Sequence, residues 1–185
     1  MIEDVIADFS AQMKATEESL RRDLSHIRTG RANTALLDGV MVDYYGAMTP
    51  LNKLATLSAP EVRLLVVQPF DQSAVGIMEK AILASGLGLS PVNDGKILRV
   101  PIPELTEERR RDLVKQVRRE GENHRVAARN HRRDANEMLK ELQGEKEITD
   151  DESRRAQEKV EELTKLAIQH LEDIVKAKEK EVMSV

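Results

Sequence analysis

Proline and glycine are confined almost entirely to the middle of this 185-residue chain. All six prolines and seven of the nine glycines lie from residue 30 to residue 103. Proline breaks a helix interior, and glycine costs about 1 kcal/mol there. The two flanks can therefore be helical, whereas the middle segment must take a mixed structure.

The flanks carry the apolar spacing of amphipathic helices. Residues 1–29 are expected to form one helix of about seven turns. Thr106 with the acids after it predicts the start of a second helix, because a hydroxyl cap and first-turn acids favour that end. Gly144 and the capping-box spacing from Thr149 to Glu152 then divide the remainder into two long helices. Three such helices bury their apolar stripes only against one another.

The middle segment favours strands. The ranges Val40–Tyr45, Arg63–Phe70 and Lys96–Ile102 are rich in strand-forming residues, and Asn93-Asp94-Gly95 before the last range is a strong hairpin turn. Ser73 is expected to cap a helix that runs to Ser85, with Val75, Met78, Ile82 and Leu83 on its apolar side.

These patterns predict an α+β protein of two domains. Residues 1–29 and 106–185 form a long three-helix bundle, and residues 30–105 form an inserted small β/α/β sandwich domain. Hinges are expected near residues 29–31 and 101–105, where the chain crosses between the domains. The candidate hinge residues are Thr29, Gly30, Arg31, Pro101 and Pro103.

Composition excludes several classes of function. The chain has no cysteine, so disulfides and thiol chemistry are impossible. No apolar run is long enough to span a membrane, and the early acids Glu3 and Asp4 do not predict a signal peptide. Four histidines without recognisable ligand spacing predict no metal site, and no catalytic motif or cofactor signature is found. A cytoplasmic protein that is not an enzyme is expected.

The charge is unevenly distributed although the net charge is only −4. Residues 106–133 hold ten basic and five acidic residues, and the other segments are acidic. On a helix, seven of these bases fall within an arc of about 100°. This basic ridge consists of Arg111, Lys115, Arg118, Arg125, Arg129, Arg132 and Arg133.

A charged helix face is most often simply solvated. Here the ridge stacks like charges at Arg125, Arg129 and Arg132, which repel one another unless an anion lies over them. The guanidinium group suits phosphate oxygens, and the segment has no aromatic residue for base stacking. The ridge therefore predicts contact with the phosphate backbone of structured RNA or of DNA.

Two smaller features favour plain structural roles. His124 and His131 fall near the core side of the basic helix and are interpreted as packed or edge histidines. Tyr44-Tyr45-Gly46 at a strand end is interpreted as half-buried strand tyrosines before a turn glycine, with an exposed patch as the alternative.

Four motifs resemble the bacterial ribosome recycling factor family, in order and spacing along the whole chain. They are Ser25-His26-Ile27-Arg28-Thr29-Gly30-Arg31-Ala32, Asp43-Tyr44-Tyr45-Gly46, Arg99-Val100-Pro101-Ile102-Pro103 with Leu105-Thr106-Glu107-Glu108-Arg109-Arg110, and Arg129-Asn130-His131-Arg132-Arg133-Asp134-Ala135-Asn136.

The resemblance implies a monomeric translation factor that binds the ribosome after termination. With elongation factor G and GTP hydrolysis by that partner, it separates the subunits and releases them from mRNA. The bundle is expected on large-subunit ribosomal RNA near the intersubunit bridges. The implied RNA contacts are Arg132 first, then Arg129, Arg133 and Arg125 on the ridge, and Arg110 and Arg28 nearer the hinge. His124 and His131 depart from the small or aliphatic residues expected in relatives.

Two other classes of function stay open on the residues alone. A helical adaptor would use the long helices for a protein partner, and it predicts only background binding to ribosomes. An architectural DNA-binding protein would use the same ridge, and it predicts a salt-sensitive complex with plain duplex DNA.

Overall fold

The computed structural model describes residues 1–184 and divides the chain into two compact units. The bundle unit contains Met1–Leu24 and Val114–Glu181. The inserted unit contains Ser25–Leu113, together with the chain end from Val182. The bundle predicted from sequence, residues 1–29 and 106–185, includes more residues at each boundary than the bundle unit does.

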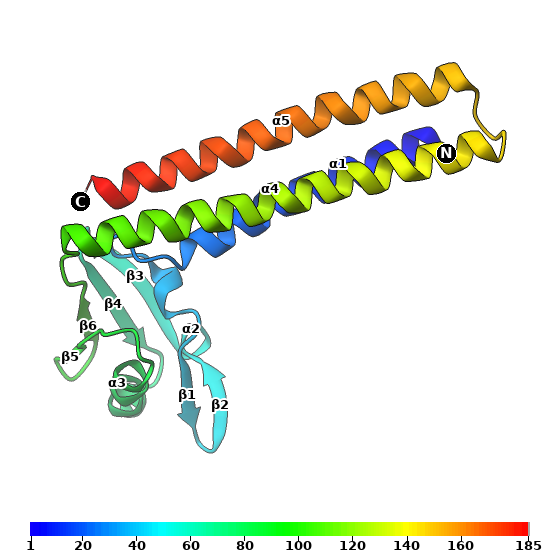
Figure 1. Cartoon of the computed structure of the whole chain (residues 1–185). Helices are drawn as coiled ribbons and strands as arrows, with labels where there is room; N and C mark the ends of the chain where they lie inside the picture. Colours follow the sequence, from blue (N-terminus) through cyan, green and yellow to red (C-terminus); the bar gives the residue numbers. More distant parts are fainter. Residues whose placement is uncertain (185) are drawn as a thin grey trace. The chain divides into compact units, whose positions relative to one another are not determined.

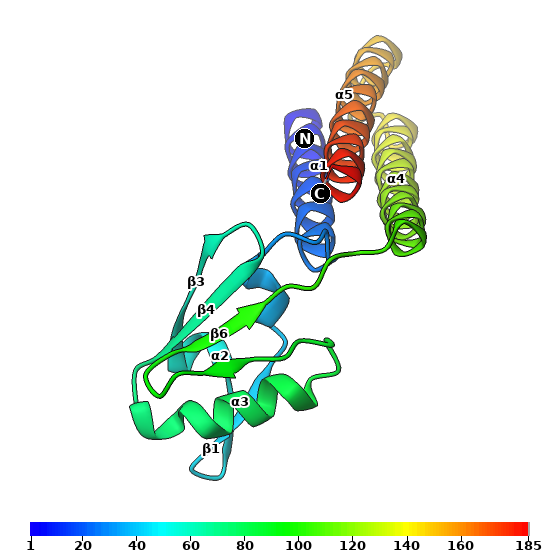
Figure 2. The same ribbon diagram turned by 90° about the vertical axis from the view of Figure 1, so that its left-hand side faces the viewer.

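Three long helices supply the bundle unit, as Figures 1 and 2 show. They are α1 (Ile2–Ser25, 24 residues), α4 (Glu107–Gly144, 38 residues) and α5 (Asp150–Met183, 34 residues). The predicted caps of α4 and α5 are confirmed. The Thr106 hydroxyl accepts a hydrogen bond from the Arg109 amide at 3.2 Å, and Thr149 and Glu152 exchange the two bonds of a capping box. The first helix ends at Ser25, earlier than expected.

Each helix of the bundle buries one stripe against the other two. The α1 stripe contains Phe9, Met13, Leu20 and Leu24. The stripes of α4 and α5 are built from smaller side chains, and their buried members are Val117, Ala128, Ala135 and Leu139 on α4 and Ala156, Val160, Ala167 and Leu171 on α5. Small residues allow close approach, most of all at Gly121, where an added Cβ would lie 2.5 Å from Cγ2 of Val175.

The inserted unit has two sheets and four short helical segments around one core. A two-stranded hairpin joins β1 (Met41–Tyr44) to β2 (Ala47–Pro50). A four-stranded antiparallel sheet has the order β3-β4-β6-β5. Its strands are β3 (Ala55–Glu61), β4 (Leu64–Pro69), β5 (Val92–Asn93) and β6 (Leu98–Pro101), and the helices are η1 (Thr34–Leu37), α2 (Leu51–Leu54), η2 (Gln72–Ala74) and α3 (Val75–Ala84).

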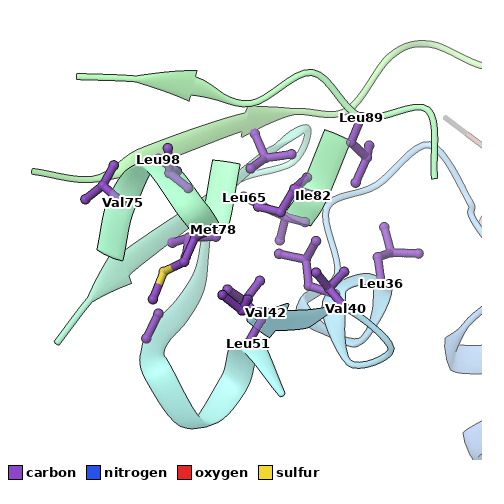
Figure 3. Close-up of a cluster of buried hydrophobic side chains, with 14 of the residues drawn as sticks. Leu36, Val40, Val42, Leu51, Leu65, Val75, Met78, Ile82, Leu89 and Leu98 are labelled. Atoms are coloured by element: carbon purple, nitrogen blue, oxygen red, sulfur yellow. The ribbon is translucent and has the colours of Figure 1, made fainter. Parts of the chain in front are cut away.

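The core of the inserted unit lies between α3, the two sheets and η1 (Figure 3). Met78 and Ile82 of α3 point toward Leu65 of β4 and Val42 of β1, and all four are fully buried. Alternation along the strands produces this core, because every second residue faces the same side. The β/α/β architecture expected from the sequence is confirmed.

Several local predictions for the inserted unit are wrong. Ser73 does not cap α3; Asp71 accepts from the Ser73 amide and caps η2 instead. Leu83 is exposed and does not belong to the apolar side of α3. The strands β2 and β3 and the short helix α2 were not predicted.

The two tyrosines at the hairpin end differ in exposure, so each interpretation holds for one of them. Tyr44 is half-buried and donates to Asp71 Oδ2 at 3.1 Å, whereas Tyr45 is 83% exposed. Tyr45 and Gly46 both have positive φ, as the turn of a tight hairpin requires.

Among the described residues, no helix combines the length and apolar character needed to cross a bilayer.

Candidate nucleic-acid interface

The predicted basic ridge lies on α4, beside the buried stripe of that helix and not on the opposite side as the sequence suggested. Arg133 is the most open of its central members, with 74% of its side chain exposed, and Arg132 is 39% exposed. The helix is held by Val117, Ala128 and Leu139, which are fully buried. The buried stripe anchors the helix, which presents the guanidinium groups in a row.

The ridge is not a bare stack of like charges. Acidic side chains of α5 lie against it: Arg118 donates to Glu179 at 2.7 Å, Arg125 to Glu172 at 3.5 Å and Arg132 to Glu161 at 3.2 Å. These three acids share one face of α5, because their spacings of eleven and seven residues are close to whole helical turns. The sequence argument that the arginines lack anions is therefore wrong.

A further acid belongs to α4 itself. Glu122 lies 2.5 Å from Arg125 and 3.4 Å from Arg129. Hydrogen bonding to Glu179, with the charge of that carboxylate, raises the pKa of Arg118, so this arginine stays charged. Exposed ion pairs of this kind contribute about 0–1 kcal/mol each. They order the arginine side chains but are weak enough to exchange for phosphate.

A hollow of about 620 Å³ lies at the end of the ridge nearest the end of α4. Arg129, Arg132 and Arg133 line it with Lys140, and Glu161 faces them. Asn136 lines it too, and its Oδ1 is one of two buried side-chain polar atoms in residues 1–184 without a hydrogen-bond partner. The hollow therefore collects four positive charges, with Glu137 and Glu161 also in its lining, around an amide oxygen that can still accept a hydrogen bond.

The other two predicted arginines, Arg28 and Arg110, belong to the inserted unit. Arg28 is half-buried and donates to the Leu87 carbonyl at 3.0 Å. Arg110 is also half-buried and donates to the Met183 carbonyl at 3.3 Å and to Leu105 at 3.4 Å. Both have structural partners, and their role in RNA contact stays a prediction.

The segments that enter and leave the inserted unit both hydrogen-bond to the turn between β3 and β4. The Ala32 amide donates to the Val62 carbonyl at 2.6 Å, and the Ile102 amide donates to the Arg63 carbonyl at 2.8 Å. Pro101 pairs with Leu64 inside the sheet, so a hinge at Pro101 itself does not fit. Hinge candidates compatible with these bonds are Thr29, Gly30 (φ +78°) and Arg31 at the entry and Pro103 with the residues after it at the exit.

His124 and His131 are both partly buried on α4, where the sequence placed them. His124 lies beside two carboxylates that sequence reasoning did not connect to it. Asp23 comes from α1, and Glu120 precedes His124 by one helical turn. The four-residue spacing of Glu120 and His124 was the available signal, whereas Asp23 required the fold.

Taken together, these features define a two-unit α+β protein with an arginine-rich surface on one long helix. A model of the family described as "Ribosome recycling factor" matches residues 20–183. The chain belongs to the ribosome recycling factor family.

Relatives and solved structures agree over the whole chain. The ribosome-recycling factors of Heliobacterium modesticaldum and Geobacillus kaustophilus are each 52% identical over 185 residues and are covered completely, as is this chain. A solution structure of a ribosome recycling factor matches with a TM-score of 0.77 and 42% identity, covering 100% of this chain and 98% of that one. Another match is to models of the T. thermophilus ribosome recycling factor and E. coli elongation factor G bound to the E. coli post-termination complex. Its TM-score is 0.68, with 44% identity and 99% of each chain covered.

Proposed function

We propose that this chain recycles ribosomes after termination. It binds the post-termination ribosome and, together with elongation factor G, separates the subunits and releases them from mRNA. The observation that carries this proposal is the 52% identity to a ribosome-recycling factor over the full length of both chains. The chemical step is GTP hydrolysis by elongation factor G, and this chain contributes binding and mechanical coupling.

The basic ridge is the surface proposed to hold the large-subunit ribosomal RNA near the intersubunit bridges. Arg129, Arg132 and Arg133 supply three forked donors around one hollow, which suits adjacent phosphates. Phosphate replaces Glu122 and Glu161 as the partner of the arginines, and because those ion pairs are exposed, little free energy is lost in the exchange. The acids also disfavour binding to anions that do not fit the row.

The inserted unit exposes large apolar side chains, which suit a protein partner. Tyr45, Met48, Val62 and Phe70 are each more than half exposed, and all four are large and apolar. Exposed aromatic residues and methionine are enriched at protein interfaces. Elongation factor G is the partner proposed for this unit.

Movement between the two units is the proposed source of subunit separation. The segments 29–31 and 103–106 lie outside the sheet of the inserted unit and form the proposed hinge. Binding drives separation only if the factor binds separated or strained subunits more tightly than the intact ribosome, since equal affinity shifts nothing. The chain has no cysteine, so a disulfide introduced across the hinge would be its only one. It should block separation and preserve ribosome binding.

The decisive experiment is light scattering of post-termination ribosomes mixed with this protein, elongation factor G and GTP, with each component left out in turn. A fall in scattering that needs every component is expected. If scattering stays constant with components that another recycling factor activates, and the protein does not co-sediment with ribosomes, the proposal fails and the adaptor interpretation gains.

Arg132→Ala tests the ridge. Loss of one phosphate contact should weaken ribosome binding by about tenfold or more and lower the slope of affinity against salt by about one ion. Arg21→Ala, at an exposed position of α1, is the control and should leave both unchanged. Equal affinity and slope in the Arg132 variant would remove that residue from the interface, and tight binding to plain duplex DNA would favour the architectural alternative.

A further inference from the structure

Three side chains from two helices converge within the bundle unit. Asp23 lies near the end of α1, and Glu120 and His124 lie one turn apart on α4. One potential ligand atom from each residue lies within 4.8 Å of the other two. The four-residue spacing places Glu120 and His124 on one face of α4, and the ion pair of His124 with Asp23 places that face against α1.

The orientation of the His124 ring is fixed by the main chain. Its Nδ1 lies 2.8 Å from the Glu120 carbonyl oxygen, which can only accept, so Nδ1 carries the hydrogen. In the neutral ring the lone pair is then on Nε2, and Nε2 lies 3.3 Å from Oδ2 of Asp23. A lone pair facing a carboxylate oxygen is repulsive, so this arrangement calls for either a proton or a metal ion between the two atoms.

We propose that Asp23, Glu120 and His124 bind a divalent metal ion of the Zn²⁺ class. Zinc accepts imidazole nitrogen and carboxylate oxygen at about 2.0–2.2 Å, and water completes a tetrahedral set of three protein ligands. The imidazole disfavours Mg²⁺ and Ca²⁺, which take oxygen ligands. Small movements of the half-exposed Asp23 side chain bring its oxygen to that distance.

The surroundings of His124 are those of a metal ligand. A histidine that binds metal commonly donates its other ring hydrogen to a main-chain carbonyl, as His124 does to Glu120. Its side chain is only 12% exposed, so water competes weakly for the ring nitrogen. The bound ion would link the last turn of α1 to α4, close to where the chain leaves the bundle unit at Leu24.

A second histidine of the bundle unit provides the comparison. His170 Nδ1 lies 3.0 Å from Glu17 Oε1, but this pair offers two ligand groups and the His170 side chain is 56% exposed. It is therefore a plain ion pair or hydrogen bond, and His170→Gln serves as a matched control for His124→Gln.

Calorimetric titration of Zn²⁺ into the full chain, first freed of metal by a chelator, tests the site. We expect one tightly bound ion per chain, at least tenfold weaker binding in His124→Gln and Glu120→Gln, and unchanged binding in His170→Gln. A hundredfold excess of Zn²⁺ over Kd should raise the Tm of the native protein by roughly 5–10 °C. Equal Zn²⁺ binding by the native protein and His124→Gln would overturn the proposal.

NMR of the His124 ring gives a readout that needs no variant. Long-range ¹H–¹⁵N correlation should show a hydrogen on Nδ1 and a Zn²⁺-dependent shift of Nε2. A ring that keeps hydrogens on both nitrogens at neutral pH in excess Zn²⁺ would show that a proton holds the position between His124 and Asp23, and that result also overturns the metal site.

Discussion

In the bundle unit, the buried side chains form one narrow stripe along each helix, whereas those of the inserted unit form a single compact cluster between residues 36 and 102. The surfaces differ in the same way. The bundle unit displays arginines paired with acids, and the inserted unit displays large apolar side chains such as Tyr45 and Phe70. A helix that buries one narrow stripe can carry charged residues on the rest of its surface. A small sheet domain cannot bury all of its apolar residues, so some are exposed at its turns and edges.

This contrast separates the two binding tasks. Charged rows on rigid helices suit phosphate, and exposed aromatic and methionine side chains suit protein. If the two cores are independent, damage to one unit should remain local.

The largest expected effect comes from one core substitution in each unit. Leu65→Ala in β4 and Leu139→Ala in α4 each remove a fully buried side chain, which costs about 2–5 kcal/mol. Hydrogen exchange should show loss of protection in the strands for the first variant and in the helices for the second. Equal loss across both units in either variant would show that the cores are coupled.

A smaller effect is expected from glycine substitutions in the two units. Gly121→Ala places a Cβ 2.5 Å from Val175 Cγ2 in the bundle, whereas Gly76→Ala in α3 meets nothing within 4 Å. Overpacking costs about 1–3 kcal/mol and the gain in helix propensity is at most about 1 kcal/mol, so Gly121→Ala should destabilise and Gly76→Ala should stabilise. Denaturant unfolding measures both, and a stabilising Gly121→Ala would mean that α4 and α5 separate easily at this point.

The caps of the long helices could be predicted because they are local. The cap at Thr106 and the capping box from Thr149 to Glu152 can each be recognised within four consecutive residues. The strand β3 was not predicted because Pro60 weakens its strand-like sequence pattern. The proline is tolerated because β3 is an edge strand with an irregular register between Ser58 and Glu61.

The site was predictable in position but not in electrostatics. The row of arginines follows from spacing along one helix, but it lies beside the buried stripe, where acids of α5 reach it. Its partners Glu161, Glu172 and Glu179 depend on the register of α5 against α4, which no local pattern specifies. The same holds for Asp23 beside His124.

Neutralising an acid of α5 tests whether the acids beside the ridge weaken its binding to phosphate. Glu161→Gln removes the charge beside Arg132 and should tighten ribosome binding by about two- to fivefold, the size of one exposed ion pair. Co-sedimentation over a salt series measures the change. Glu158→Gln, whose partner is Arg154, is the control. The gain should vanish in the double variant with Arg132→Ala; a gain that persists would show general attraction rather than release of Arg132.

The smallest effect concerns one capping carboxylate in each unit. Hydrogen bonds from the Ser73 hydroxyl, the Ser73 amide and Tyr44 lower the pKa of Asp71 in the inserted unit. Bonds from the amide and hydroxyl of Thr149 lower the pKa of Glu152 in the bundle unit. A carboxyl with a lowered folded-state pKa stabilises the fold above its unfolded pKa, and this stabilisation is lost as the pH falls through the folded value.

Asp71→Ala and Glu152→Ala should therefore lower the Tm at pH 7, and the difference from the native protein should shrink as the pH falls from about 5 to about 2. Glu18→Ala, at an exposed position inside α1, removes an acid that caps no helix and should change the Tm little at any pH. Since each cap lies in a different unit, hydrogen exchange should place the first loss around η2 and the second at the start of α5. A Tm difference that stays constant with pH would mean that the side chains act by packing, and the two caps would then carry no charge-dependent part of the stability.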